Sequence, residues 1–275
     1  MFKTLNPVED TITTRITVTN GFHDGGVGTL AGSNYTTASL SATQKSYYYN
    51  LQYNSKDHFS VSYGHIGGSG SSEQLTTVEG TTQAIYKQFY NFTESSAEKL
   101  RDQKGFLGFG DGTATASDAY FVVAERLQMK DRLNPGTWTM KLSGSSTPGS
   151  SSFISLTDNS KTTAPSSAPF GERYDIVSGS AGTVVVAAST KTYGFFYPDA
   201  GVMVFSANAL SSSLPGTKGF ILSGSDFAKK GTVGNGFAQD VRVTSAADNA
   251  NKMRIALQKG SVTLRSEEQQ YIFDH

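Results

Sequence analysis

An alternating stretch at residues 46–63 sets the fold class of this chain, and it reads SYYYNLQYNSKDHFSVSY. Its aromatic and aliphatic residues recur with a period of two, as on a β-strand whose side chains alternate between two faces. The NSKD segment at residues 54–57 interrupts the pattern with residues that favour tight turns. The stretch therefore predicts a β-hairpin with a turn at its centre.

Further strands are predicted on both sides of this hairpin. Residues 11–19 read TITTRITVT and place Ile12, Ile16 and Val18 on one face. Residues 119–127 form a nearly continuous apolar run, AYFVVAERL, which is typical of a central strand. The other predicted strands lie at residues 137–142, 153–156, 173–177, 183–187, 193–197, 201–205, 240–244, 253–257, 261–265 and 269–275.

One principal helix is predicted near residues 73–93. Leu75, Val78, Ile85 and Phe89 recur there at roughly the spacing of a helical face. A further helical turn is expected at residues 97–103. Many short strands, one helix and no alternating βαβ units favour a mainly β (β-rich α+β) fold with antiparallel sandwich or barrel-like sheets.

Two segments in the middle of the chain are poor in core-forming residues. Residues 143–152 are almost entirely Ser, Gly, Thr and Pro, and residues 159–169 are nearly as polar, so both predict surface loops. We therefore expect a β-rich domain with one helix at residues 1–145 and a loop region at residues 146–170. A second β-rich part follows at residues 171–275, either as a separate part or within the same domain.

The composition limits the classes of partner. Charged residues make up only 17% of the chain and the formal net charge is zero, so weak self-repulsion favours association. A nucleic-acid partner is not expected, because binding phosphates needs a clustered basic surface. The chain has no cysteine, which excludes disulfides and thiolate chemistry. We expect no signal peptide and no membrane-spanning helix, since no long apolar run is present.

Residues that could carry catalysis or bind a metal do not form a recognisable motif. His23, His58, His65 and His275 lack the spacing of metal ligands and are expected in loops or at the surface. No serine lies in a G-x-S-x-G elbow. A glycosidase-like carboxylate pair stays open, with the candidates Glu125, Asp131, Glu172 and Asp175, although ion pairs with basic neighbours are the preferred interpretation. We expect no enzymatic activity, no cofactor and no metal.

Aromatic residues are the best candidates for contact with a partner. The run at residues 47–49 puts tyrosines on both faces of one strand, so either both faces are covered within the domain or one meets a partner. The first ten residues form a small apolar arm, and the final strand is expected to pair in a sheet of this chain or of a neighbour. The candidate interface residues are Phe2, Leu5, Val8, Tyr47, Tyr49, Tyr53, Tyr271 and Phe273.

Three segments carry a family resemblance: MFKTLNPVED at residues 1–10, KDRLNPG at residues 130–136 and YPDAGV at residues 197–202. Together they resemble virion structural proteins of large contractile-tailed phages, including T4-like phages of cyanobacteria. The resemblance implies a multi-copy tail or baseplate component that is made in the host cytoplasm and resides in the virion. Its implied partners are other virion proteins and copies of itself.

Three other functions stay open beside assembly in the tail or baseplate. A receptor- or glycan-binding module of a tail fibre or spike would use the same Tyr-rich strands and Ser/Gly-rich loops, with a host-surface glycan as its partner. A capsid decoration protein and a glycan-degrading spike are the remaining alternatives.

Overall fold

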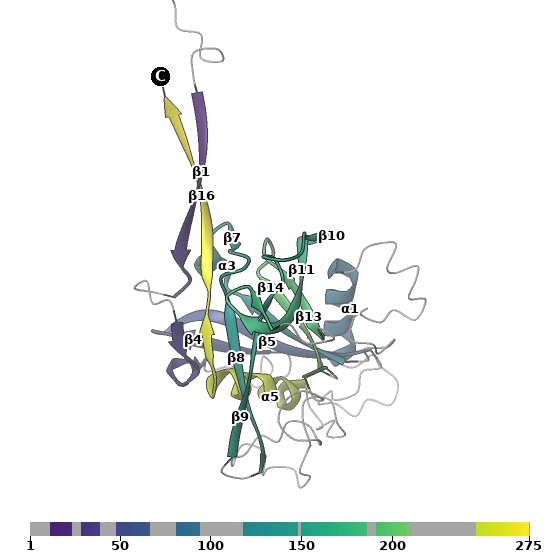
Figure 1. The fold of residues 1–275 in the computed structure, drawn as a ribbon. Helices are drawn as coiled ribbons and strands as arrows, with labels where there is room; N and C mark the ends of the chain where they lie inside the picture. Colours follow the sequence, from purple (N-terminus) through teal and green to yellow (C-terminus); the bar gives the residue numbers. More distant parts are fainter. Residues whose placement is uncertain are drawn as a thin grey trace, which may run out of the picture.

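A computed structural model describes residues 12–23, 29–38, 48–66, 81–93, 118–147, 150–185, 191–207, 209–210 and 246–274 of the 275-residue chain. The protein is mainly β and its strand pairs are antiparallel, as the sequence predicts (Figure 1). The strands are β1 (Ile12–Gly21), β2 (Thr29–Ala31), β3 (Thr36–Thr37), β4 (Tyr48–Tyr53), β5 (Lys56–His65), β6 (Asp118–Ala124), β7 (Arg132–Leu133), β8 (Thr139–Thr147), β9 (Ser150–Asp158), β10 (Ser166–Ala168), β11 (Gly171–Ser180), β12 (Thr183–Val184), β13 (Thr192–Tyr197), β14 (Val202–Ser206), β15 (Ser261–Thr263) and β16 (Arg265–Asp274). The helices are η2 (Gly32–Asn34), α1 (Thr81–Thr93), α3 (Arg126–Met129) and α5 (Ala246–Gln258).

Most strands belong to one large curled sheet. Its order is β2-β15-β8-β9-β11-β13-β14-β6-β5-β4-β3, and the short strands β10 and β12 both pair with β11. A separate small sheet has the order β1-β16-β7. The large sheet thus continues across residues 146–170, although the division of the chain into domains stays a prediction.

The local hairpins follow the sequence pattern. In the β4–β5 hairpin, Asn54 and Ser55 adopt φ angles of 50° and 60°, the left-handed values that a two-residue type I′ turn requires. The β13–β14 and β11–β12 hairpins form as predicted, with the turn of the latter at Ala181 and Gly182. These hairpins are confirmed. They could be predicted because the alternation of apolar and polar residues and a nearby turn determine which strands pair.

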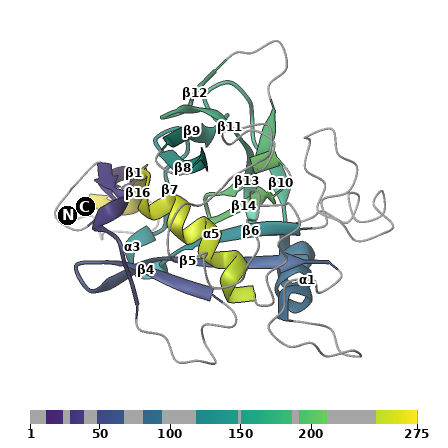
Figure 2. The same cartoon turned by 90° about the horizontal axis from the view of Figure 1, so that it is seen from below.

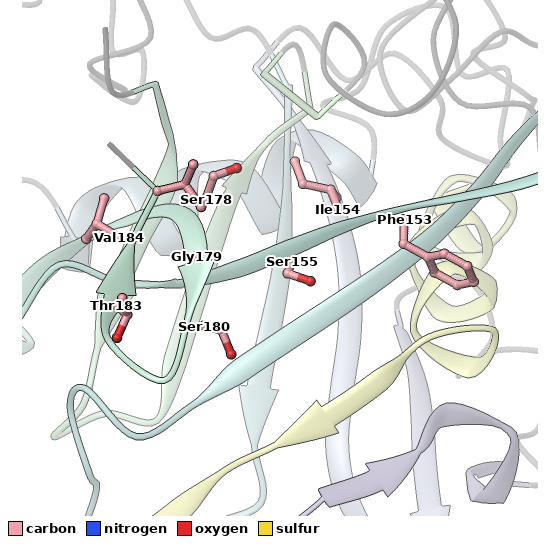
Figure 3. A pocket seen from close by; sticks show the side chains of 9 residues that line it. Phe153, Ile154, Ser155, Ser178, Gly179, Ser180, Thr183 and Val184 are labelled. Carbon is pink, nitrogen blue, oxygen red and sulfur yellow. The ribbon is translucent and has the colours of Figure 1, made fainter. Parts of the chain in front are cut away.

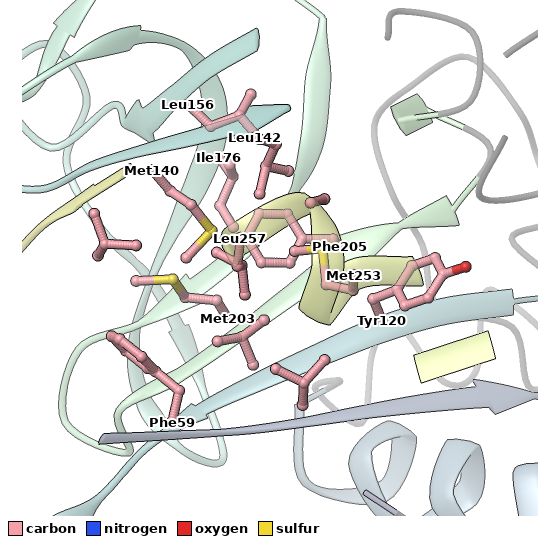
Figure 4. Close-up of a cluster of buried hydrophobic side chains, with 14 of the residues drawn as sticks. Phe59, Tyr120, Met140, Leu142, Leu156, Ile176, Met203, Phe205, Met253 and Leu257 are labelled. Carbon is pink, nitrogen blue, oxygen red and sulfur yellow. The ribbon is translucent and has the colours of Figure 1, made fainter. Parts of the chain in front are cut away.

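The core lies on both faces of the large sheet. Alternate residues of β6 point to opposite sides, so that Tyr120 joins the cluster against α5 and Phe121 joins the cluster against α1. Helix α5 packs on β4, β5 and β8, and α1 packs on β5 (Figure 2). The larger cluster includes Phe59, Tyr120, Met140, Leu142, Leu156, Ile176, Met203, Phe205, Met253 and Leu257 (Figure 4). Coverage on both faces explains why residues 119–124 are almost entirely apolar.

Several boundaries differ from the prediction. Residues 253–257 form part of helix α5 and not a strand, because Ala250, Met253 and Leu257 bury at helical spacing. Residues 143–152 are largely strand and not loop, since β8 and β9 pair as a long hairpin there. The strand predicted to reach residue 127 ends at Ala124, and α3 follows.

Helix α1 confirms the principal helix over Thr81–Thr93, and residues 73–80 of that prediction lie outside the described residues. The predictions at residues 97–103 and 240–244 also lie outside them. None of the helices that the structure describes combines the length and the apolar character that a membrane crossing requires.

Candidate assembly interface

A two-stranded ribbon extends away from the body of the protein. Strands β1 and β16 pair along their full length, from Ile12↔Asp274 at the far end to Gly21↔Arg265 at the base (Figure 1). Among the described strands, a third strand, β7, pairs with β16, and it does so at Ser266 and Glu267. A two-stranded ribbon is marginally stable by itself in water, and its edges present unpaired backbone groups to other chains. The β1–β16 ribbon is therefore the candidate docking element.

The base of the ribbon is held by one arginine and three carboxylates. Arg132 donates from Nε to Glu267 Oε2 at 2.6 Å and from Nη1 to Glu172 Oε2 at 3.1 Å. The Asp199 carboxylate lies 3.5 Å from the same Nη1. These acidic residues come from β16, β11 and the β13–β14 turn, so Arg132 joins the small sheet to the large one.

The charges around Arg132 affect two pKa values. Burial alone would lower the pKa of Arg132, but the hydrogen bond and charge of Glu267, together with Glu172 and Asp199, outweigh burial and raise it. The Tyr174 hydroxyl donates to Glu172 Oε2 at 3.3 Å. Burial and the Glu172 charge raise the pKa of Tyr174 to about 12. The arginine therefore stays charged across the physiological pH range.

Backbone contacts of the β7 connector add to this anchor. Asp131 N–H donates to the Glu267 carbonyl at 3.0 Å, and its carboxylate accepts from Gln269 N–H at 2.6 Å. The Asn134 side chain accepts from the Thr19 hydroxyl at 2.9 Å and donates to Glu267 Oε1 at 3.0 Å. Both strands of the ribbon are therefore fixed at the base, whereas the far half pairs only within itself among the described strands.

A buried contact between two histidines holds the segment that directly follows β1. His23 and His58 have 2% and 0% exposure, and their Nδ1 atoms lie 3.3 Å apart. The Tyr35 hydroxyl lies 3.3 Å from His23 Nδ1. Burial, and to a smaller extent the charge of the nearby Tyr53, raise the pKa of Tyr35, so the phenol stays protonated. The expectation of loop or surface positions is wrong for His58 and His65, which are buried in β5, whereas His23 lies in the bend after β1 but is buried inside an aromatic cluster. Within the described residues, no group of three His, Cys, Asp or Glu side chains gathers as a metal site would require.

The candidate interface residues fall in different places. Tyr271 and Phe273 lie in the far half of β16, opposite Arg15 and Thr13 of β1. Phe2, Leu5, Val8 and Tyr47 lie outside the described residues. The ribbon thus contains two of the candidates, and their contact with a partner stays a prediction.

Tyr49 and Tyr53 are half-buried and pack against the core. The Arg254 guanidinium lies 5.4 Å from the centre of the Tyr49 ring, and the Tyr53 ring meets the His23 and His58 rings edge-on. Intramolecular packing thus accounts for the buried part of both tyrosines.

The candidate carboxylates make different contacts. Glu172 belongs to the Arg132 network, and Asp131 holds the Gln269 amide. Asp175 lies in β11, where burial raises its pKa although Arg173 opposes the change. Glu125 precedes α3 and its backbone carbonyl accepts from Met129 N–H at 3.0 Å. The contacts of Asp131 and Glu172 are those of structural anchors.

Sequence reasoning missed Arg132, which had no distinguishing pattern in the connector. The sequence feature that could have identified Arg132 is its place beside the turn-forming Asn-Pro-Gly segment. That feature is weak without knowledge of the strand pairing. Exposed apolar side chains mark the same region, since Ile16 of β1 is 40% exposed and Leu127 of α3 is 83% exposed. Helix α3 packs beside β16, so both side chains lie on or near the ribbon.

A comparison of the chain with protein families, with curated proteins and with solved structures finds no match. The assignment of a function therefore depends on the geometry of this chain, and the ribbon is its most informative element.

Proposed function

We propose that this protein is a structural subunit of a phage particle, located in the tail or baseplate, and that it acts by protein–protein assembly. The observation that carries this proposal is the β1–β16 ribbon, which extends from the body and whose far half has no further strand partner among the described strands. The virion itself is suggested by the resemblance of the segments at residues 1–10, 130–136 and 197–202.

The anchoring of the ribbon supports a role in docking. A mobile chain segment would need no ion pairs at its base. In this protein, Arg132 and the buried His23–His58 pair fix the direction in which the ribbon leaves the body. A pre-positioned strand pair loses less conformational entropy on binding than a disordered segment does. The ribbon is thus built to meet a partner in a defined orientation.

The low charge of the surface supports association of many copies. The formal net charge is zero, so neighbouring subunits repel one another little. Exposed apolar side chains at Ile16 and Leu127 lie where such a contact would form. Their burial against a neighbour would contribute favourable free energy through the hydrophobic effect.

The direct test is to look for the protein in purified particles. Mass spectrometry of the particles should find it in multiple copies, and a cryo-EM map should show the ribbon against a neighbouring subunit. Its absence from the particles would reject the proposal.

A variant pair isolates the role of the ribbon. Tyr271→Ser/Phe273→Ser should reduce incorporation into particles strongly while the melting temperature of the free protein changes little. Thr163→Ala/Ser167→Ala, which changes two exposed residues of the body, is the control and should incorporate normally. Equal incorporation of the two variants would contradict a docking role for the ribbon.

Deletion of residues 1–10 tests the proposed N-terminal arm with Phe2, Leu5 and Val8. The deletion should weaken incorporation into particles more than it weakens folding. An equal loss of both would reject the arm as a docking segment.

A further inference from the structure

A groove of about 440 Å³ lies beside β9, where β11 turns away from it (Figure 3). Its volume is in the range of sites that hold small molecules or short peptide segments. It is lined on one side by Phe153, Ile154 and Ser155, and on the other by the β11–β12 hairpin from Ser178 to Val185. The groove is separate from the ribbon and from the Arg132 network.

The groove exposes an edge of β9. Strand β11 pairs with β9 only at Leu156, Thr157 and Asp158, so residues 153–155 have no strand partner on that side among the described elements. The N–H of Asn159 donates to the Asp175 carbonyl of β11. Because alternate residues of a strand direct their backbone groups to the same side, the N–H and C=O groups of Ser155 and Phe153 face the groove.

The β11–β12 hairpin keeps this edge open. Its tip folds onto the start of β8, where Thr139 Oγ1 lies 2.9 Å from Ser180 Oγ and accepts from Ala181 N–H at 2.9 Å. The Gly182 N–H donates to Thr157 Oγ1 at 2.8 Å. The hairpin is thereby held over the outer face of β8 and β9 and does not continue the sheet beside Ser155.

The side chains at the rim suit an extended segment with apolar and acidic residues. Phe153 is 47% exposed and Val185 is 60% exposed, so an occupant would cover apolar surface on both sides. The Lys141 ammonium lies 4.3 Å from the centre of the Phe153 ring and places a positive charge beside the groove. An open strand edge between apolar side chains is the arrangement by which sheets bind an added strand.

We propose that the groove of one copy binds the far half of β16, residues 269–273, from a second copy. Gln269 at its start donates its N–H to Asp131 Oδ2, and beyond it residues 270–273 have no strand partner on the outer edge among the described strands. They contain the sequence YIF at residues 271–273. Glu268 and Asp274, which flank this segment, are acidic and complement the positive charge of Lys141. The chain thus carries both halves of a strand-addition contact.

The two halves lie far apart in one molecule. The ribbon and the β8–β9 hairpin extend to opposite ends of the body (Figure 1). A contact between the opposite ends of identical subunits is heterologous and generates rings or filaments. The inference rests on the proposed function, because both describe assembly. It adds that the groove beside β9 of one copy meets the far half of β16 of another.

Engineered cysteines test this contact without interference, because the natural chain has none. The variant Phe153→Cys/Tyr271→Cys should give a ladder of disulfide-linked multimers on a non-reducing gel after oxidation. The experiment is done with the isolated protein at high concentration and with purified particles. An equal mixture of the two single variants should give a mixed dimer only. Thr163→Cys/Tyr271→Cys, with Thr163 exposed on the body, is the control and should give no ladder. Absence of both ladder and mixed dimer would overturn the proposal.

A proline at the groove provides a second readout. Ser155→Pro removes the N–H that faces the groove and should weaken self-association about two- to tenfold, which corresponds to one lost hydrogen bond. Ser155→Ala is the matched control and should associate like the natural protein. If Ser155→Pro fails to fold, the disulfide experiment alone decides. A folded Ser155→Pro variant that associates normally would contradict strand addition.

The outcomes separate this inference from the proposed function. Presence of the protein in particles without a 153–271 disulfide would reject the groove contact and leave the structural role intact. A disulfide in the isolated protein, with no protein in particles, would support the contact and reject the virion role. Binding of the free protein to a glycan array, abolished by Phe153→Ala, would overturn the inference and assign the groove to carbohydrate.

Discussion

Arg132 Nε lies 2.6 Å from Glu267 Oε2, and this contact joins β7, which lies between β6 and β8 in the chain, to the base of the projecting ribbon. The same guanidinium reaches Glu172 of β11 and Asp199 of the β13–β14 turn. One side chain therefore couples three segments that are distant in sequence.

Replacement of Arg132 should loosen the ribbon. Arg132→Ala removes charged hydrogen bonds, which contribute about 1.5–3 kcal/mol in general. Partial exposure of the group reduces that contribution, so we expect a loss of about 1–2 kcal/mol. Hydrogen exchange should accelerate at residues 266–270. Arg126→Ala, whose guanidinium donates to the Asp131 carbonyl, is the control. Unchanged exchange in β16 would show that the ribbon is held by other contacts.

The buried histidine pair should be sensitive to side-chain volume. His58→Ala leaves a cavity in the aromatic cluster and should cost about 2–5 kcal/mol, as large-to-small core substitutions do. His58→Phe keeps the volume and loses the contact with His23, so its cost should be smaller. Urea unfolding of both variants measures the difference. Equal losses would mean that the polar contact, and not the packing, stabilises this region.

Stability should fall at high pH because of Tyr174. Its pKa is raised to about 12 in the folded protein and is about 10 in an unfolded chain, so the folded state favours the protonated phenol. This contribution is fully present below pH 10 and is lost as the pH rises from 10 to 12. The melting temperature of Tyr174→Phe should therefore fall less over this interval than that of the natural protein. Tyr48→Phe serves as the control, and identical curves for Tyr174→Phe and the natural protein would refute this assignment.

Gly260 should not accept a side chain. A Cβ atom there would lie 1.7 Å from the Lys141 carbonyl oxygen of β8, which is backbone and cannot swing away. Gly260→Ala should therefore separate the end of α5 from β8 and cost about 1–3 kcal/mol or more. Thermal unfolding measures the loss, with Lys259→Ala as the neighbouring control. A variant as stable as the natural protein would show that the contact between α5 and β8 can move apart without cost.

Elements with local pairing could be predicted from the sequence. The β4–β5 and β13–β14 hairpins follow from alternation around a turn, and α1 follows from helical spacing. Helix α5 was mistaken for a strand because residues 253–257 alone fit both periods, and only Ala250 upstream reveals the helical face. The inner parts of β8 and β9 were predicted as strands, but their outer parts at residues 143–152 were predicted as loop because serine and glycine are poor core formers.

Contacts between distant segments could not be predicted. Both ribbon strands were recognised as strands, but nothing in their residues identifies each as the partner of the other. The His23–His58 pair and the Arg132 network likewise depend on which segments the fold brings together. The groove beside β9 arises where two strands part, and a period-two pattern carries no information about such a point.

The pairing of β1 with β16 closes almost the entire chain into a loop. Contacts at such separation form late in folding, since the entropy of loop closure must be overcome before they contribute. The body must therefore bring Gly21 and Arg265 together before the remaining pairs of β1 and β16 can form, from the base of the ribbon to its far end. A half-folded chain would lack this strand pair, so incorporation into a larger structure would select for molecules whose folding is complete.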